Sequence, residues 1–383
     1  MKVLLVFLLY CGILSGQTSQ NELRQTATEN YENQQYALAL ESYEALLATD
    51  STDLKLFERA ALSAYKLGDL PVARKYFLEL EKKDTSSRVA LTSLASIYET
   101  NSNTPKAIKY YHKLIKHFPD NAINFRKLAQ QYQKAGLKNE ARNYYEQALE
   151  KNNKDQYTIK GLGELYLREK KYALTDSLLN LGLGRDSSNI QFNLLIANSK
   201  YLQKAYDSTV YYMEVIRGKY DLRPHQNKML GYAYMQVDSL DRAIFHLTKA
   251  INDPGTKEYA HYNLGVAYEK QGNTEFALHH FQEAVKEGIS DDVDLYHRNV
   301  ARLYAKEEDL KAAIPHYQDA YKYGEDPLVL FYLARASDNY YKDKNIAIRY
   351  YTKFIKSNYD HAEYQKYAAD RKRYLKELMH LQK

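Results

Sequence analysis

The sequence has 383 residues, of which 39 are tyrosine, none is tryptophan and only one is cysteine. Fifteen glycines and seven prolines are too few for a collagen-like or loop-rich all-β chain, and one cysteine excludes a disulfide scaffold or a zinc site built from paired cysteines. The net charge of +6 comes from 54 basic and 48 acidic residues without a concentrated basic stripe, which argues against nucleic-acid binding.

The first sixteen residues, 1–16, are predicted to be a secretory signal peptide. Lys2 supplies a positive charge, an unbroken apolar run extends from Val3 to Tyr10, and small residues lead up to Gly16. The run is too short to span a bilayer, and no later stretch approaches the ~18 apolar residues of a transmembrane helix. We therefore expect cleavage after Gly16, export from the cytoplasm and a mature chain without a transmembrane segment.

A second interpretation of the N-terminus depends on Cys11. The stretch that ends Leu9-Tyr10-Cys11 loosely resembles a bacterial lipobox, in which the cysteine is acylated and becomes the mature N-terminus, although Tyr10 is bulkier than the small residue that such a box prefers. Under either interpretation the protein leaves the cytoplasm and lies in the periplasm or at the outer membrane. If Cys11 is removed with the signal, the mature chain cannot depend on disulfides.

From about residue 20 onward, small and aromatic residues recur with a period of 34 residues. Leu128, Ala129 and Tyr132 are followed in the same unit by Ala141 and Tyr145. The phase holds without a gap over 20–291, which makes eight units. The first motif recurs at Ala60-Ala61, Leu94-Ala95-x-x-Tyr98, Leu162-Gly163-x-x-Tyr166, Leu230-Gly231-x-x-Tyr234 and Leu264-Gly265-x-x-Tyr268.

The repeat continues to the end of the chain after one shift in phase. A two-residue insertion near Ser290 precedes a ninth and a tenth unit at 294–361, in which Ala301 and Tyr304 hold the recurring positions. The last segment, 362–383, carries apolar residues at helical spacing beside many charges. We expect it to be a helix that caps the end of the array.

Within each unit, the recurring residues are spaced as on two helices. Leu128 and Tyr132 are four residues apart, as are Ala141 and Tyr145, so each set forms one apolar stripe on a helix. Glycines fall between the two stripes, where a first helix is expected to end. These glycines are Gly68, Gly136 and Gly272.

This pattern resembles the tetratricopeptide repeat, a helix–turn–helix unit of 34 residues, over nearly all of the mature chain. The resemblance implies an all-α fold: a right-handed α-solenoid of about ten repeats with a C-terminal capping helix. A single helix pair cannot bury its stripe alone, so stability comes from stacked neighbours. Most tyrosines then have a structural cause, because one position beside the second stripe is held by Tyr76, Tyr110, Tyr144, Tyr212 and Tyr350.

Three units depart from the pattern, and we expect them to be looser. The fifth has Thr175 and the sixth has Thr209 where alanine is usual. In the tenth, Arg335 and Asp338 replace a small residue and a tyrosine. The basic run at 371–373 is interpreted as the solvated face of a helix.

No motif for catalysis occurs in the sequence. It lacks His-Glu-x-x-His, Gly-x-Ser-x-Gly and a phosphate-binding loop. The neighbours His279 and His280 point in different directions on a helix, and no acidic or histidine set completes a metal site around them. We therefore expect no enzyme activity, no cofactor and no metal, with an enzyme that has a divergent site on this frame as a further hypothesis.

In the tetratricopeptide family, the first helices of successive repeats line a concave groove that binds a peptide or a protein surface. The resemblance implies a non-catalytic scaffold or adaptor, which we expect in the bacterial cell envelope. An alternative is a module that binds a carbohydrate or cell-wall polymer by stacking tyrosines on sugar rings. By position, the groove residues expected to contact a partner are Arg126, Gln130, Lys160, Asn198, Tyr201, Lys228, Tyr232, Tyr262, Arg298, Arg302 and Tyr332.

Overall fold

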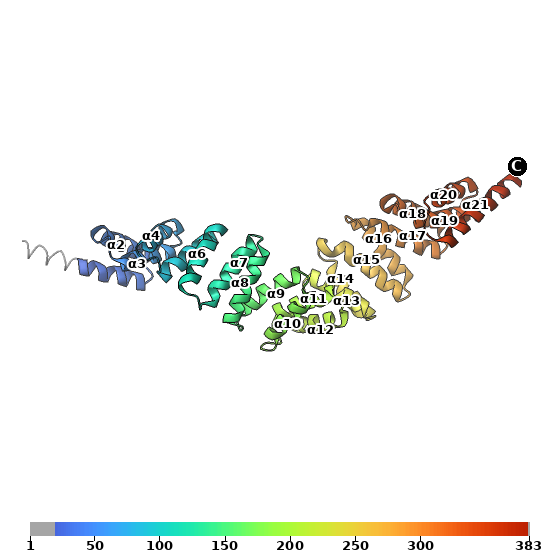
Figure 1. Ribbon diagram of the computed structural model, residues 1–383. Helices are drawn as coiled ribbons and strands as arrows, with labels where there is room; N and C mark the ends of the chain where they lie inside the picture. Colours follow the sequence, from blue (N-terminus) through green and yellow to red (C-terminus); the bar gives the residue numbers. More distant parts are fainter. Residues whose placement is uncertain (1–19, 382–383) are drawn as a thin grey trace, which may run out of the picture. The chain divides into compact units, whose positions relative to one another are not determined.

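The computed structural model describes residues 20–381, and its regular secondary structure there consists of α-helices (Figure 1). The predicted signal peptide at 1–16 and the candidate anchor residue Cys11 lie outside the described residues. The chain divides into two compact units, one ending at Arg185 and the other beginning at Asp186. Within the described residues, no helix is long and apolar enough to cross a membrane.

The first unit is a series of consecutive helix pairs. A helical segment at 20–32 comes first, and each later first helix packs both on its own partner and on the second helix before it. The helices are α2 (Tyr36–Thr49), α3 (Leu54–Leu67), α4 (Leu70–Lys83), α5 (Arg88–Thr100), α6 (Thr104–His117), α7 (Ala122–Lys134), α8 (Lys138–Lys151), α9 (Gln156–Arg168) and α10 (Tyr172–Leu183).

The second unit continues the same alternation and ends with a single longer helix that packs on the last pair. Its helices are α11 (Ile190–Leu202), α12 (Tyr206–Arg217), α13 (Pro224–Gln236), α14 (Leu240–Ala250), α15 (Pro254–Lys270), α16 (Thr274–Glu287), α17 (Val293–Lys306), α18 (Leu310–Gly324), α19 (Pro327–Tyr340), α20 (Lys344–Lys356) and α21 (Ala362–Leu381). The all-α fold of consecutive helix pairs that the sequence predicts is thereby confirmed.

Local sequence determines where the helices begin and end. Asp53 and Asp69 precede α3 and α4, and each side chain accepts a hydrogen bond from a backbone N–H group of the first turn. Three glycines adopt a left-handed backbone just after a first helix, with φ of 82° at Gly68 and 78° at Gly136 and Gly272. Residues that carry a side chain rarely adopt this backbone conformation, which glycine adopts readily. These glycines therefore end the first helices, as predicted.

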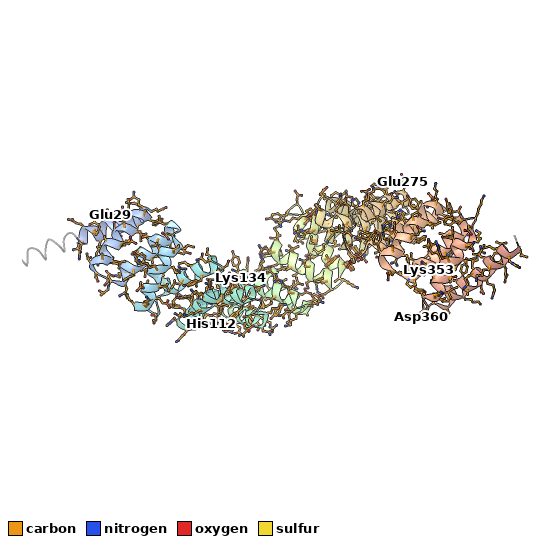
Figure 2. All side chains as sticks on the ribbon, turned by 90° about the horizontal axis from the view of Figure 1, so that it is seen from above. Glu29, His112, Lys134, Glu275, Lys353 and Asp360 are labelled. Atoms are coloured by element: carbon orange, nitrogen blue, oxygen red, sulfur yellow. The ribbon has the colours of Figure 1, made fainter. Side chains whose placement is uncertain are left out.

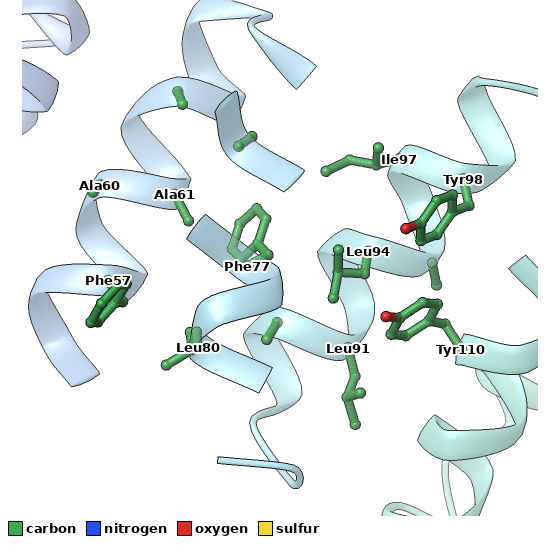
Figure 3. Close-up of a cluster of buried hydrophobic side chains, with 14 of the residues drawn as sticks. Phe57, Ala60, Ala61, Phe77, Leu80, Leu91, Leu94, Ile97, Tyr98 and Tyr110 are labelled. Carbon is green, nitrogen blue, oxygen red and sulfur yellow. The ribbon is translucent and has the colours of Figure 1, made fainter. Parts of the chain in front are cut away.

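The recurring alanines and leucines form the core between helices. Ala60, Ala61 and Leu94 are fully buried, and Figure 3 shows them with the ring of Phe77, which projects from α4 between α3 and α5. Small residues let the helix axes approach, and the larger side chains fill the space that remains.

Two glycines in first helices show how tight this packing is. A Cβ atom at Gly161 of α9 would lie 2.6 Å from the ring of Tyr145 on α8. A Cβ atom at Gly265 of α15 would lie 2.6 Å from the ring of Phe281 on α16. Both rings are almost completely buried. The glycine and the ring therefore occupy complementary positions, and the Gly161-containing motif serves helix packing.

A second aromatic layer explains much of the tyrosine content. Tyr110 on α6 stacks on Tyr98 of α5, and Tyr144 on α8 stacks on Tyr132 of α7, with ring centroids 5.4 Å apart in both pairs. Stacking of this kind adds roughly 0.5–1.5 kcal/mol beyond the burial of area. In three pairs of the second unit a histidine takes the place of the second-helix tyrosine, and each of these histidines, such as His280 of α16, stacks on a first-helix tyrosine. We call the position that Tyr110, Tyr144 and His280 hold on their second helices the ring position.

Candidate functional site

In the first unit, three successive first helices form one groove of about 460 Å³. We call the surface presented by the first helices the first-helix face. The groove brings together Gln130 and Lys160, two of the residues predicted to contact a partner. Its lining consists of Glu99, Gln130, Gln133, Lys134, Tyr145, Tyr157, Lys160, Gly161, Glu164 and Arg168.

One acidic side chain in this groove is held by its neighbours. Glu99 accepts hydrogen bonds from the hydroxyl of Tyr111 at 2.7 Å and from Lys127 at 3.2 Å, and the ammonium of Lys134 lies 3.7 Å away. Burial acts to raise the pKa of Glu99, but the Tyr111 hydrogen bond and the two lysines outweigh it, and the pKa lies below its usual value. Glu99 is therefore an anchored anion.

The edge of the groove is more basic than its floor. Lys134, labelled in Figure 2, and Arg168 are both exposed on the ends of α7 and α9. Lys160 lies 3.7 Å from Glu164 on the same helix, an exposed pairing that stabilises by less than about 1 kcal/mol. Gln130 adds an amide, which both donates and accepts hydrogen bonds.

Arg126 lies apart from the groove, in a role that the sequence did not predict. Only 13% of its side chain is exposed, and its guanidinium lies 3.3 Å from the carboxylate of Asp155 and 4.9 Å from the centre of the Tyr157 ring. These contacts join α7 to the start of α9. Arg126 therefore positions Tyr157 at the groove wall and offers little surface of its own to a partner.

In the second unit, the structure groups Tyr201, Tyr232 and Lys228 from the predicted set. Tyr201, Tyr206 and Tyr232 pack edge to face with ring centroids 5.8 or 6.0 Å apart, and Tyr232 contacts Tyr259 at 6.1 Å. The ammonium of Lys228 lies 4.8 Å from the centre of the Tyr259 ring. Burial raises the pKa of Tyr201. These tyrosines cover part of one another's surface.

Three other uncharged residues that were predicted to contact a partner are half-buried in the second unit, namely Asn198, Tyr262 and Tyr332. Tyr262 packs on Tyr296 with ring centroids 5.2 Å apart, and Tyr332 stacks on Tyr317 at 6.2 Å. Asn198 lies on α11, three residues before the tyrosine cluster begins. The structure thus places these side chains along the first helices but does not gather them into one site.

The two predicted arginines of the second unit form ion pairs that join successive helix pairs. Arg302 makes two hydrogen bonds to the carboxylate of Glu269, at 2.6 and 2.7 Å, and this bonding raises the pKa of Arg302. Arg298 lies 2.8 Å from Asp294 and 3.1 Å from Asp326, the residue that precedes α19. Both guanidinium groups are therefore already engaged by the protein's own carboxylates.

Histidines pair across helices in a way that the sequence analysis missed. The Nδ1 atoms of His261 and His280 are 3.0 Å apart, and those of His297 and His316 are 2.9 Å apart. In each pair the two residues are 19 positions apart in the sequence. Within residues 20–381, no group of three or more His, Cys, Asp or Glu side chains is arranged to hold a metal ion. The pairs hold helices together through ring contact and hydrogen bonding.

Comparison with protein families identifies the repeat. Models of the tetratricopeptide repeat match residues 25–88, 58–122 and 258–287. The chain carries tetratricopeptide repeats. The matched segments include α5, the first helix of the groove, and the helix pair that contains His261 and His280. A comparison with curated proteins finds no match.

Several solved structures are similar to this chain. A tetratricopeptide repeat protein from Parabacteroides merdae ATCC 43184 is 16% identical, covers 65% of this chain and 98% of its own, and has a TM-score of 0.45. YrrB, described as a TPR protein with an unusual peptide-binding site, is 19% identical over 49% of this chain and 96% of its own, with a TM-score of 0.45. Pseudomonas aeruginosa pilF is 16% identical over 58% and 97%, with the same score.

The buried histidines of the tetratricopeptide repeats predict a loss of stability in acid. Burial, with the charges of His261 and His279, lowers the pKa of His280 to about 4, below the 6.5 of an unperturbed histidine. Between these two values the unfolded chain binds a proton that the folded chain does not, so stability falls as the pH drops from 6.5 towards 4. His280→Tyr, which restores the ring of other repeats, is expected to lose less stability between pH 7 and pH 4.5 in urea denaturation. Equal losses in the two proteins would contradict this expectation.

Proposed function

We propose that this protein is a non-catalytic scaffold that binds a peptide or protein segment on the first-helix face of its first unit. The observation that carries the proposal is the groove across α5, α7 and α9, which combines amides, exposed cations and the exposed ring of Tyr157. Amides can hydrogen-bond to a peptide backbone, and cations can pair with its carboxylates. Tyrosine and arginine are also the residues enriched at binding hot spots.

The groove of the first unit is a better candidate binding site than the predicted contact residues of the second unit. Arg298 and Arg302 are already paired with carboxylates of the protein, so a partner would have to displace those contacts. Tyr201 and Tyr232 pack edge to face, which leaves less free ring surface for a sugar than the sequence suggests. This arrangement supports a protein partner over the carbohydrate alternative.

We further propose that the scaffold acts in the cell envelope. The charged start, apolar run and small residues of 1–16 support export. A mature chain that begins after Gly16 would be free in the periplasm, whereas one that begins with an acylated Cys11 would be held at a membrane. Mass spectrometry of the mature N-terminus from the native host distinguishes the two, and a cytoplasmic chain that keeps Met1 would contradict export.

The test of the binding site is site-specific crosslinking in the native host. A photocrosslinking amino acid at Gln130 should capture a partner that mass spectrometry identifies. The double variant Lys134→Gln with Arg168→Gln should reduce capture roughly 5- to 10-fold, because charges at the rim of an interface steer association. The matched control is Lys138→Gln with Lys154→Gln, which removes two exposed lysines of the same unit that do not line the groove.

Equal capture by both double variants would place the partner elsewhere on the protein. A glycan array run with the same proteins tests the alternative. Glycan binding that is lost on Tyr232→Ala but unaffected by the Lys134 and Arg168 substitutions would favour the carbohydrate module instead.

A further inference from the structure

The loop that joins α16 to α17, at 288–292, contains the two-residue insertion that shifts the repeat (Figure 1). We call it the insertion loop. After α2, α4 and α8 the next residue closes the turn itself, because its side chain accepts a hydrogen bond from the backbone N–H two positions later. These residues are Asp50, Asp84 and Asn152. After α16 that place is taken by Gly288, which has no side chain to close the turn.

The insertion loop is held instead by Glu258, a residue of the neighbouring helix α15. The Glu258 carboxylate accepts hydrogen bonds from the backbone N–H of Ile289 at 3.3 Å, from that of Ser290 at 3.4 Å, and from the Ser290 hydroxyl. The Ser290 hydroxyl accepts in turn from the backbone N–H of Asp292 at 3.2 Å. Burial acts to raise the pKa of Glu258, but the hydrogen bonds from Ser290 and Ile289 outweigh it, and the pKa lies below its usual value. A charged carboxylate therefore fixes the loop at neutral pH.

The fixed loop presents an apolar side chain to solvent. Ile289 is 93% exposed, more than any other large apolar side chain of residues 20–381. Single exposed apolar residues are common on protein surfaces, but most do not have a backbone that a buried-side carboxylate of another helix holds in place. Because the backbone of Ile289 is already ordered, a partner that buries this side chain would lose little conformational entropy on binding.

Two acidic side chains stand beside this isoleucine without a basic partner. Asp291 and Asp292 are both exposed, and neither forms an ion pair within the part of the chain that the structure describes. Asp292 precedes α17, yet its side chain makes no capping hydrogen bond. The nearby Glu287, in contrast, is paired with Lys257. The uncompensated negative charges would repel an anionic membrane or a nucleic acid and attract a basic protein surface.

We propose that the insertion loop docks on a different protein, with Ile289 in an apolar pocket that lysine or arginine side chains border. The basic side chains of the partner would pair with Asp291 and Asp292, while the buried isoleucine would supply most of the binding energy. This contact lies on the second unit and shares no residue with the peptide groove of the first unit. The protein would thus hold two partners at separate sites.

The test begins with a photocrosslinking amino acid at Asp291 of the full protein in its native host. The matched control carries the same amino acid at Asn252, an exposed residue of the preceding turn between repeats. A product that forms at 291 and not at 252 identifies the partner by mass spectrometry, and the partner is then purified for binding measurements.

Calorimetry with the purified partner measures what Ile289 contributes. Ile289→Asp should lower the affinity roughly tenfold or more, because the side chain can no longer enter an apolar pocket. Leu202→Asp is the matched control, since Leu202 is a 53% exposed leucine of α11 in the same unit, and its affinity should equal that of the wild-type protein. Lys134→Gln with Arg168→Gln should also bind this partner unchanged, which separates the insertion loop from the groove of the first unit.

Two further variants test the fixed backbone and the charges. Glu258→Ala releases the loop and should lower the affinity about three- to tenfold, with faster hydrogen exchange at the amides of Ile289 and Ser290. Asp291→Asn with Asp292→Asn should mainly slow association and weaken its dependence on salt. The proposal is overturned if no product is specific to 291, if that product is a second copy of this chain, or if Ile289→Asp binds the partner as tightly as the wild-type protein.

Discussion

Phe281→Ala is expected to destabilise the second unit by about 3–5 kcal/mol, the range for removing a buried phenylalanine ring. Phe281 is fully buried between α15 and α17, against Gly265, Val300 and Leu303. Gly265 has no side chain that could move into the space, so the cavity would stay open. Native-state hydrogen exchange of the amides in α15 to α17 measures the loss, because stability in a repeat array is partly local to each helix pair.

The control for this prediction lies on the same helix. Phe276 is 49% exposed and contacts Tyr268 at 5.2 Å, so Phe276→Ala should lower stability by no more than about 1 kcal/mol. The comparison separates burial from the loss of an aromatic residue as such. Similar effects of Phe276→Ala and Phe281→Ala would show that the tight fit of ring and glycine does not stabilise the array.

The sequence predicts the fold well because one packing problem recurs along the chain. The period of 34 residues reflects small residues where helices approach and rings where space remains, as at Gly161 and Tyr145. The left-handed glycines that end first helices follow from the same periodicity. Each feature appears many times, so a departure in one unit does not hide the pattern. The exact limits of the repeats and the signal peptide stay predictions.

The candidate sites were harder to predict, because they depend on how neighbouring helices are rotated. Position in the repeat placed Gln130 and Lys160 at a groove, but it could not show that Arg302 is held by a carboxylate 33 residues away. Comparing the ring position across the repeats shows from sequence alone that Leu178 of α10 stands where the other second helices from α4 to α20 carry a tyrosine or a histidine.

The tenth unit shows how a departure from the pattern can be compensated by tertiary structure. Sequence analysis interpreted Asp338 as a source of looseness and the basic run at 371–373 as a solvated face. In the structure, Asp338 is 3% exposed, and its carboxylate accepts a hydrogen bond of 2.6 Å from Arg371 on α21. Lys344 lies 3.6 Å from the other carboxylate oxygen. The anion that Arg371 binds is therefore inside the protein, and the pair joins α21 to α19.

Arg371→Met is accordingly expected to weaken the attachment of α21 by about 2–3 kcal/mol, because removing one partner leaves a buried carboxylate incompletely compensated. This loss of free energy is smaller than is usual for a buried ion pair, because 36% of the Arg371 side chain is exposed and solvent screens part of the interaction. Hydrogen exchange of the α21 amides should accelerate more than that of α15. Arg373→Met is the matched control, since Arg373 is 70% exposed and pairs only with Asp370 on its own helix. That change should cost less than about 0.5 kcal/mol.

A double variant identifies the buried charge as the cause. Asp338→Asn removes the charge that Arg371 neutralises, so Asp338→Asn with Arg371→Met should hold α21 more firmly than Arg371→Met alone. If the effect came from losing the hydrophobic contacts of the arginine stem, the attachment of α21 would be weakened equally in the single and in the double variant. Equal exchange rates in those two proteins, or in Arg371→Met and Arg373→Met, would show that α21 is held by its apolar contacts, including fully buried Leu375, and that the ion pair contributes little.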